Sequence, residues 1–93
     1  MTDPEYEIRD APQLSRLELH IDGELAATAI YRKDPGKITF MTTDVMQGFE
    51  GRGIGGRIVA EAIKAAQGQE RDVVAVCPFM TGYLERHPEL LDS

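Results

Sequence analysis

Apolar and polar residues alternate along much of the first half of the chain. Between Leu14 and Ile21 the alternation has the two-residue period of a strand with one buried face. The apolar positions are Leu17, Leu19 and Ile21, and the polar positions are Arg16, Glu18 and His20. We therefore expect a strand in this segment, with His20 on a solvated face.

Turn residues separate this strand from further alternating segments. Asp22-Gly23 supplies the residue types of a two-residue hairpin, because both central positions of such a turn take positive φ. Glu24 to Arg32 is the next predicted strand, and Asp34-Pro35-Gly36 predicts a turn before another over Lys37 to Thr43. The apolar positions of the middle strand are Leu25, Ala27, Ala29 and Tyr31. With a short edge strand over Tyr6 to Arg9, the pattern predicts an antiparallel meander.

After Gly53 the period of the apolar positions becomes that of an amphipathic helix. The apolar positions are Ile54, Ile58, Val59, Ala62, Ile63 and Ala66, and the charged positions on the opposite face are Arg57, Glu61 and Lys64. We expect this helix to stop at Gly68.

The end of the chain predicts one more strand and a short helix. Val73 to Cys77 is a continuous apolar run, which is typical of a strand buried on both faces, here parallel to the strand before the helix. Pro78 suits the start of a helix, which should end near Arg86 because His87 precedes a proline. The predicted fold class is α/β (α+β): a mostly antiparallel sheet with one strand–loop–helix–strand unit and a short C-terminal helix, in a single domain over residues 1–93.

Composition limits the range of functions. The chain of 93 residues is 42% hydrophobic and 28% charged, as in ordinary globular proteins. Its apolar runs are too short to span a bilayer, and the acidic start, Met1 to Glu7, lacks the features of a signal peptide. The formal net charge of -6 argues against nucleic acid as a partner. We expect a cytoplasmic monomer or weak dimer that binds neither membranes nor nucleic acid.

Neither disulfides nor metal sites are predicted. Cys77 is the single cysteine, so it cannot form an internal disulfide. His20 and His87 do not have the spacing of metal ligands. These residues must therefore be interpreted through other chemistry.

The glycine-rich segment Gly51-Arg52-Gly53-Ile54-Gly55-Gly56 is the strongest candidate site. It opens the amphipathic helix, and a helix start offers backbone N–H groups without an intrahelical acceptor, together with partial positive charge. A phosphate group suits such a position, since glycines let it approach the backbone. Arg52 and Arg57 would add charge-assisted contacts. The alternative is that the glycines only form a tight turn and let the helix pack closely.

The same segment fits the G-x-G-x-x-G pattern of dinucleotide-binding folds, but its surroundings do not. Those folds need repeated strand–helix–strand units and an acidic residue at the end of the second strand. This chain has one such unit, Cys77 stands where the acidic residue belongs, and Asp72 lies at the other end of that strand. A P-loop is excluded because no Lys-Ser or Lys-Thr pair follows the glycines.

Residues Val45 to Gly55 (VMQGFEGRGIG) resemble the cofactor motif of the GNAT acetyltransferase superfamily. The resemblance extends over nearly the whole chain to the short stand-alone GNAT-like proteins of about this length. The other matching segments are Leu17 to Tyr31, Val76-Cys77-Pro78-Phe79, Tyr83-Leu84 and Arg86-His87-Pro88-Glu89. It implies a GNAT-like N-acetyltransferase that binds acetyl-CoA or coenzyme A and acts on an unidentified amine.

The resemblance also implies where the cofactor lies. Its binding residues would be Val45, Gly51, Arg52, Gly53, Ile54, Gly55, Gly56 and Arg57. Pantetheine would lie between the strands that end near Val45 and at Cys77, which splay apart, with the thioester near Cys77. Relatives usually carry Arg or Gln in place of Glu50 and often His in place of Thr42. Glu50 therefore brings a carboxylate near the pyrophosphate, and Thr42 removes a possible base.

Three residues are candidates for the chemistry. Cys77 would accept the acetyl group or protonate coenzyme A, and the alternative is a buried cysteine that only packs. Tyr83 lies one residue from the position of a thiolate-protonating tyrosine in larger family members, and core packing is its alternative. His87 would act as a base near neutral pH or would only cap the helix.

The tight turns between the early strands leave no room for the helices with which larger GNAT enzymes build their acceptor site, so the acceptor pocket should be open.

Two other functions stay open. A non-catalytic module that binds coenzyme A or acyl-CoA is one alternative. A small interaction domain without a nucleotide site is the other.

Overall fold

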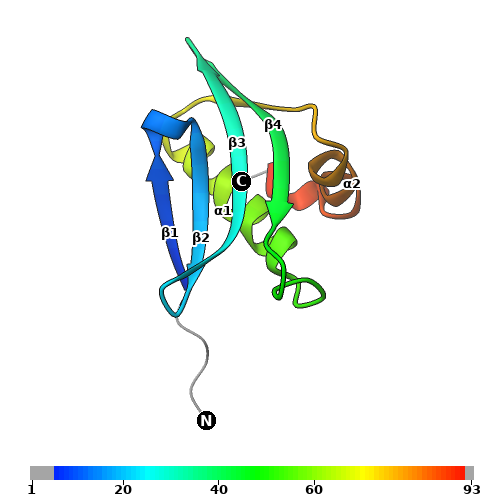
Figure 1. Cartoon of the computed structure of the whole chain (residues 1–93). Helices are drawn as coiled ribbons and strands as arrows, with labels where there is room; N and C mark the ends of the chain where they lie inside the picture. The colour runs from blue at the N-terminus through cyan, green and yellow to red at the C-terminus, as the bar shows by residue number, and fades with distance from the viewer. Residues whose placement is uncertain (1–5, 92–93) are drawn as a thin grey trace.

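The computed structural model describes residues 6–91; residues 1–5, part of the acidic start, and residues 92–93 lie outside the description. The described chain forms a five-stranded sheet and two α-helices (Figure 1). In chain order the elements are β1 (Tyr6–Ala11), the 3-10 turn η1 (Pro12–Leu14), β2 (Arg16–Ile21), β3 (Glu24–Asp34), β4 (Lys37–Val45), α1 (Ile54–Gly68), β5 (Asp72–Ala75), α2 (Pro78–Arg86) and the 3-10 turn η2 (Pro88–Leu91). The predicted fold class is confirmed.

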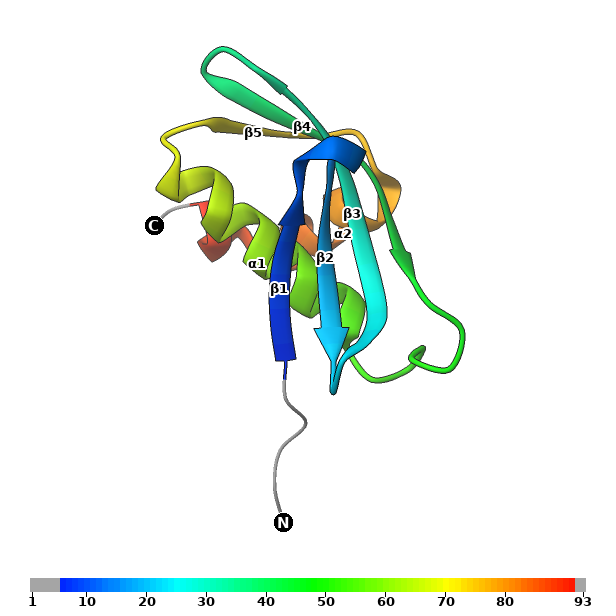
Figure 2. The same cartoon turned by 60° about the vertical axis from the view of Figure 1, so that its left-hand side comes forward.

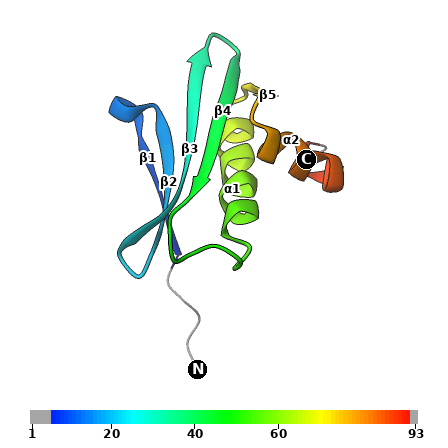
Figure 3. The same cartoon turned by 45° about the vertical axis from the view of Figure 1, so that its right-hand side comes forward.

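The strands lie in the order β1-β2-β3-β4-β5, with β1 to β4 antiparallel and β5 parallel to β4. Both helices lie on one side of this sheet, which we call the helix side, as Figures 2 and 3 show. The other side, which we call the open side, carries no helix of the described chain. None of the described helices is long and apolar enough to cross a membrane.

The predicted turns are present. Asp22 and Gly23 have φ of 50° and 87°, as a two-residue hairpin requires, and Asp is one of the few non-glycine residues that adopt such angles readily. Gly36, with φ of 76°, closes the second turn. The edge strand β1 extends to Ala11, two residues beyond the predicted end. The Tyr31 hydroxyl ties β3 to β1 by donating to Asp10 Oδ1 at 2.6 Å.

The core lies between α1 and the helix side of the sheet. The apolar helix positions predicted from the sequence are all buried: Ile54, Ile58, Val59, Ala62, Ile63 and Ala66. They pack against Leu17, Leu19, Ile21, Ala27, Ala29, Tyr31, Ile38 and Phe40 of the sheet. Burying one large aliphatic side chain contributes about 1.5–3 kcal/mol, so this interface holds the start of α1 firmly against the sheet.

Two expectations were wrong, whereas the predicted end of α1 at Gly68 is confirmed. The run Val73 to Cys77 is not buried on both faces, because β5 ends at Ala75 and is an edge strand whose Val74 is 38% exposed. His20 is not solvated, because only 12% of its side chain is exposed and its Nε2 lies 2.9 Å from Glu18 Oε1.

Candidate cofactor and acyl-transfer site

The site begins where β4 and β5 separate. Their pairing runs from Lys37↔Asp72 to Phe40↔Ala75, and the last bond joins the Val76 N–H to the Phe40 carbonyl at 3.1 Å. Beyond this point the chain after β5 turns into α2, whereas β4 continues to Val45. Within the described chain, residues 42–45 therefore pair with β3 alone. The predicted divergence of these two strands is confirmed.

The loop from 46 to 53 leads from β4 to an uncapped helix start. Gly48, Gly51 and Gly53 have φ of 94°, 80° and 72°, which a side chain would make costly. Gly53 is the N-cap of α1, and no side chain of residues 6–91 bonds to it as a cap. The first N–H groups of α1 thus combine open donor positions with the positive end of the helix dipole. An anionic group fits this position.

Gly55 and Gly56 have a different role from the loop glycines. A Cβ on Gly55 would lie 2.5 Å from Cζ of Phe79, and a Cβ on Gly56 would lie 2.6 Å from Cε2 of Tyr83. Both aromatic rings belong to α2, so these glycines let α2 pack directly on the first turn of α1. These two glycines therefore allow close packing, although their neighbour is a helix rather than the sheet.

A pocket of about 300 Å³ opens at the start of α1. Its lining residues are Val45, Phe49, Glu50, Gly51, Gly53, Ile54, Gly55, Gly56 and Phe79. They include most of the predicted cofactor residues. The volume is at the lower end for small-molecule pockets. Sequence reasoning did not identify Phe49 and Phe79 as pocket residues. For Phe79 the signal is its close approach to Gly55, which only the three-dimensional structure shows.

Arg52 and Arg57 do not line this pocket. The Arg52 guanidinium carbon lies 5.5 Å from the centre of the Phe49 ring, and that of Arg57 lies 4.5 Å from the centre of the Tyr6 ring. Arg57 Nε also lies 3.9 Å from Glu61 Oε1. Both cations thus have aromatic partners.

Glu50 brings negative charge to the pocket. Its Oε2 accepts a hydrogen bond of 2.9 Å from the Gly48 N–H, which folds the side chain back over its own loop. Because the residue also lines the pocket, its carboxylate opposes an anionic ligand there. Glu50 therefore lies beside the predicted anion site.

Cys77 sits at the start of α2, close to the point where β4 and β5 separate. It is the N-cap of α2 and is 3% exposed. Burial raises the pKa of its thiol, but the Met80 N–H, the Thr43 hydroxyl and the Phe79 N–H favour the thiolate, so the pKa lies below its ordinary value. Sequence reasoning identified the cysteine but not the donors around it.

Tyr83 and His87 lie further along α2. Their rings stack at a centroid distance of 4.4 Å, and His87 Nδ1 lies 3.3 Å from Glu89 Oε1. His87 is the C-cap of α2, whose nine residues span roughly 13 Å. The structure therefore brings Tyr83 to the first turn of α1 and His87 to Tyr83, but it separates His87 from Cys77.

Comparison with protein families gives a match over most of the chain. The model of the family described as GCN5-related N-acetyl-transferase matches residues 16–93. The match starts at the first residue of β2 and includes the glycine-rich segment, Cys77 and α2. No curated protein matches the chain.

Proposed function

The chain belongs to the GCN5-related N-acetyltransferase family, as its motifs predicted, and we propose that it uses acetyl-coenzyme A to acetylate an amine. The observation that best supports this proposal is the pocket at the uncapped start of α1, next to a strand edge without a further strand partner in residues 6–91. The N–H groups of the first turn of α1 suit the pyrophosphate. Apart from the Thr43 N–H beside Cys77, the edge of residues 41–45 that carries no further strand suits the amides of pantetheine.

In the proposed reaction Cys77 carries the acetyl group. Its thiolate attacks the thioester carbonyl carbon, an acetyl–cysteine bond forms, and coenzyme A leaves as a thiolate that takes up a proton. The uncharged amine then attacks the acetyl–cysteine carbonyl carbon, the C–S bond breaks to release the Cys77 thiolate, and the nitrogen gives up one proton to a base as the amide forms. Direct attack of the amine on the thioester is the competing route, and only the first route requires the cysteine.

Tyr83 and His87 have proposed roles in proton transfer. Tyr83 packs on Gly56 at the start of α1. We therefore propose that its hydroxyl donates the proton that the leaving coenzyme A thiolate takes up. His87 is the weaker candidate for a base, because it lies at the other end of α2. Packing and helix capping are the alternative roles of these two side chains.

Cofactor binding is tested by thermal unfolding with acetyl-CoA, coenzyme A or a nicotinamide dinucleotide. A ligand at 100 times its dissociation constant adds about 2.7 kcal/mol, and each kcal/mol raises the Tm of a domain this small by roughly 4–8 °C. We expect a rise with the two coenzyme A ligands only. A rise with the dinucleotide alone, or with none of the three, would overturn the proposed site.

Two glycine variants locate the site. Gly53→Asp puts a carboxylate at the helix start, whereas Gly36→Asp introduces the same side chain at nearly the same φ in the turn between β3 and β4. Open space surrounds both positions. We expect similar losses of stability, but only Gly53→Asp should abolish the rise in Tm with coenzyme A.

Catalysis is tested separately by the intact mass of the protein after incubation with acetyl-CoA, and by product formation with a panel of amines. We expect an acetyl increment that Cys77→Ser abolishes. Binding without any increment or product would favour the alternative function, a non-catalytic module that binds coenzyme A or acyl-CoA. A cytoplasmic location and a monomeric or weakly dimeric state stay predictions.

A further inference from the structure

A buried hydroxyl beside Cys77 has no role in the function proposed so far. Thr43 Oγ1 is inaccessible to solvent and has no hydrogen-bond partner of ordinary geometry among residues 6–91. Buried polar groups nearly always have a partner, so each exception needs an explanation. The Thr43 hydroxyl is among the groups that lower the pKa of the Cys77 thiol. A thiolate would therefore supply the missing acceptor.

An irregularity in β4 directs Thr43 toward Cys77. Ile38 and Phe40 are buried on the helix side, and strict alternation would put Thr42 on that side next. The register with β3 shifts between Ile30 and Tyr31: Tyr31 pairs with Phe40 and Ile30 with Thr42, so Met41 is an extra residue.

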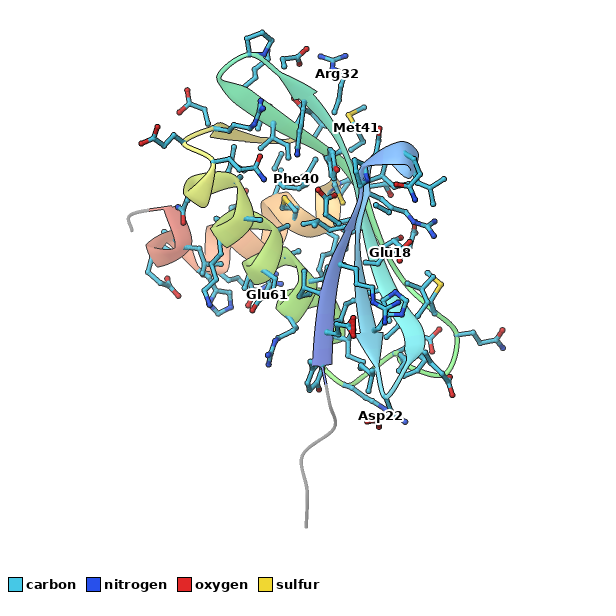
Figure 4. The ribbon with its side chains drawn as sticks, turned by 90° about the vertical axis from the view of Figure 1, so that its left-hand side faces the viewer. Glu18, Asp22, Arg32, Phe40, Met41 and Glu61 are labelled. Atoms are coloured by element: carbon cyan, nitrogen blue, oxygen red, sulfur yellow. The ribbon has the colours of Figure 1, made fainter. Side chains whose placement is uncertain are left out.

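The extra residue moves every later side chain of β4 to the opposite side. Thr43 consequently pairs with Ala29, which is fully buried on the helix side. Figure 4 shows Phe40 on the side of the helices and Met41 on the open side. Met41 is 45% exposed, in agreement with this arrangement.

Backbone donors complete the surroundings of the sulfur. The N–H groups of Met80 and Phe79 reach it from the first turn of α2, and the N–H of Thr43 reaches it from β4. All of these groups are uncharged, and no charged side chain is among the groups that act on the thiol. The Thr43 hydroxyl is the one donor in the set that a substitution can remove without changing the backbone.

We propose that Thr43 is a positioning residue that holds Cys77 as a thiolate by donating its hydroxyl hydrogen to the sulfur. Its contribution to acyl transfer rests on the function proposed above. Its effect on the ionisation of Cys77 does not, because ionisation needs neither cofactor nor acceptor. The two ideas can therefore fail independently.

The test compares three variants by the ultraviolet absorbance of the thiolate against pH, with Cys77→Ser as the blank. Thr43→Val keeps the shape of the side chain and removes the hydroxyl, Thr43→Ser keeps the hydroxyl, and Thr42→Val makes the same change on the open side. The free energy of a hydrogen bond to a charged group corresponds to a pKa shift of about one to two units. We expect Thr43→Val to raise the midpoint by that amount, and the other two variants to titrate like the wild type.

An unchanged midpoint in Thr43→Val, or equal shifts in Thr43→Val and Thr43→Ser, would overturn the proposal. If Thr43→Val does not fold, Thr43→Ala removes the same hydroxyl and is subject to the same criterion. Where acetyl-CoA acetylates the wild type, Thr43→Val should slow acetylation of Cys77 about tenfold or more at neutral pH. The rates should converge at alkaline pH, and a loss that is equal at every pH would refute positioning through ionisation.

Discussion

Replacing Glu50 by Gln should strengthen the binding of coenzyme A. Glu50 lines the pocket, and its carboxylate accepts a hydrogen bond from the Gly48 N–H. The carbonyl oxygen of Gln can accept the same bond, so the substitution removes the charge and leaves the loop in place. Any change in affinity then reports the electrostatic effect of the carboxylate on the bound phosphates.

The size of the effect follows from the pocket dimensions. A pocket of about 300 Å³ is about 7 Å across, taking the cube root of its volume. Two unit charges at that separation repel by roughly 0.6–1.2 kcal/mol for effective dielectric constants of about 80 to 40. Removing the carboxylate should therefore lower the Kd for coenzyme A about three- to eightfold.

Isothermal titration calorimetry at two salt concentrations measures the effect. The gain should shrink at high salt, because at 1 M the screening length falls to about 3 Å. Glu70→Gln is the matched control, since Glu70 follows the far end of α1, whose 15 residues span about 22 Å. Equal affinity of Glu50→Gln and wild type at low salt, or a gain that does not depend on salt, would refute the electrostatic reasoning.

Three further predictions concern stability. Gly55→Ala and Gly56→Ala force a methyl group against Phe79 and Tyr83, which should lower the free energy of unfolding, measured by chemical denaturation, by about 1–3 kcal/mol. Adding Phe79→Ala should reduce the effect of Gly55→Ala but not that of Gly56→Ala. An equal effect of Gly55→Ala with and without Phe79→Ala would contradict the clash. Backbone and hydroxyl donors outweigh the effect of burial and lower the pKa of Cys77, so ionisation of this thiol stabilises the fold fully above the unfolded-state pKa and the contribution is lost as pH falls through the folded-state pKa. The free energy of unfolding of the wild type, relative to that of Cys77→Ala, should therefore rise with pH between these two pKa values. A difference that stays constant with pH would contradict this prediction. Burial and the Asp10 carboxylate raise the pKa of Tyr31 from 10.0 to about 12, so the stabilisation from its protonated hydroxyl is complete below pH 10 and disappears as pH rises toward 12. Tyr31→Phe should lower the free energy of unfolding by about 0.5–1.5 kcal/mol at neutral pH and lose less stability than the wild type at alkaline pH. An unchanged loss of stability at alkaline pH would contradict the raised pKa of Tyr31.

Local patterns predicted most of the fold. The alternation in β2 and the helical period after Gly53 each report one buried face, and that information lies within a few consecutive residues. The two hairpin turns depend on φ values that Asp22, Gly23 and Gly36 adopt readily. The glycine-rich segment was identifiable as a site because an uncapped helix start is also a local feature.

Features that depend on distant neighbours could not be predicted. The apolar run at Val73 suited a central strand, but the order of strands puts β5 at the edge. His20 is covered because Glu18 and adjacent strands surround it, which no periodicity reveals. Arg52 stacks on an aromatic ring rather than facing the pocket. The role of Thr43 required the register of two paired strands.

The extra residue in β4 has a consequence for which changes of sequence the family fold can accept. Met41 is half exposed, so many side chains should be acceptable at this position. Deleting it would restore strict alternation, with Thr42 directly after Phe40, so Thr43 would still pair with Ala29 and Val45 with Ala27 on the helix side. The extra residue therefore contributes the local bend and stronger twist of a bulged strand, and the fold should accept either one or two residues between Phe40 and Thr43 with the same side chains on the helix side.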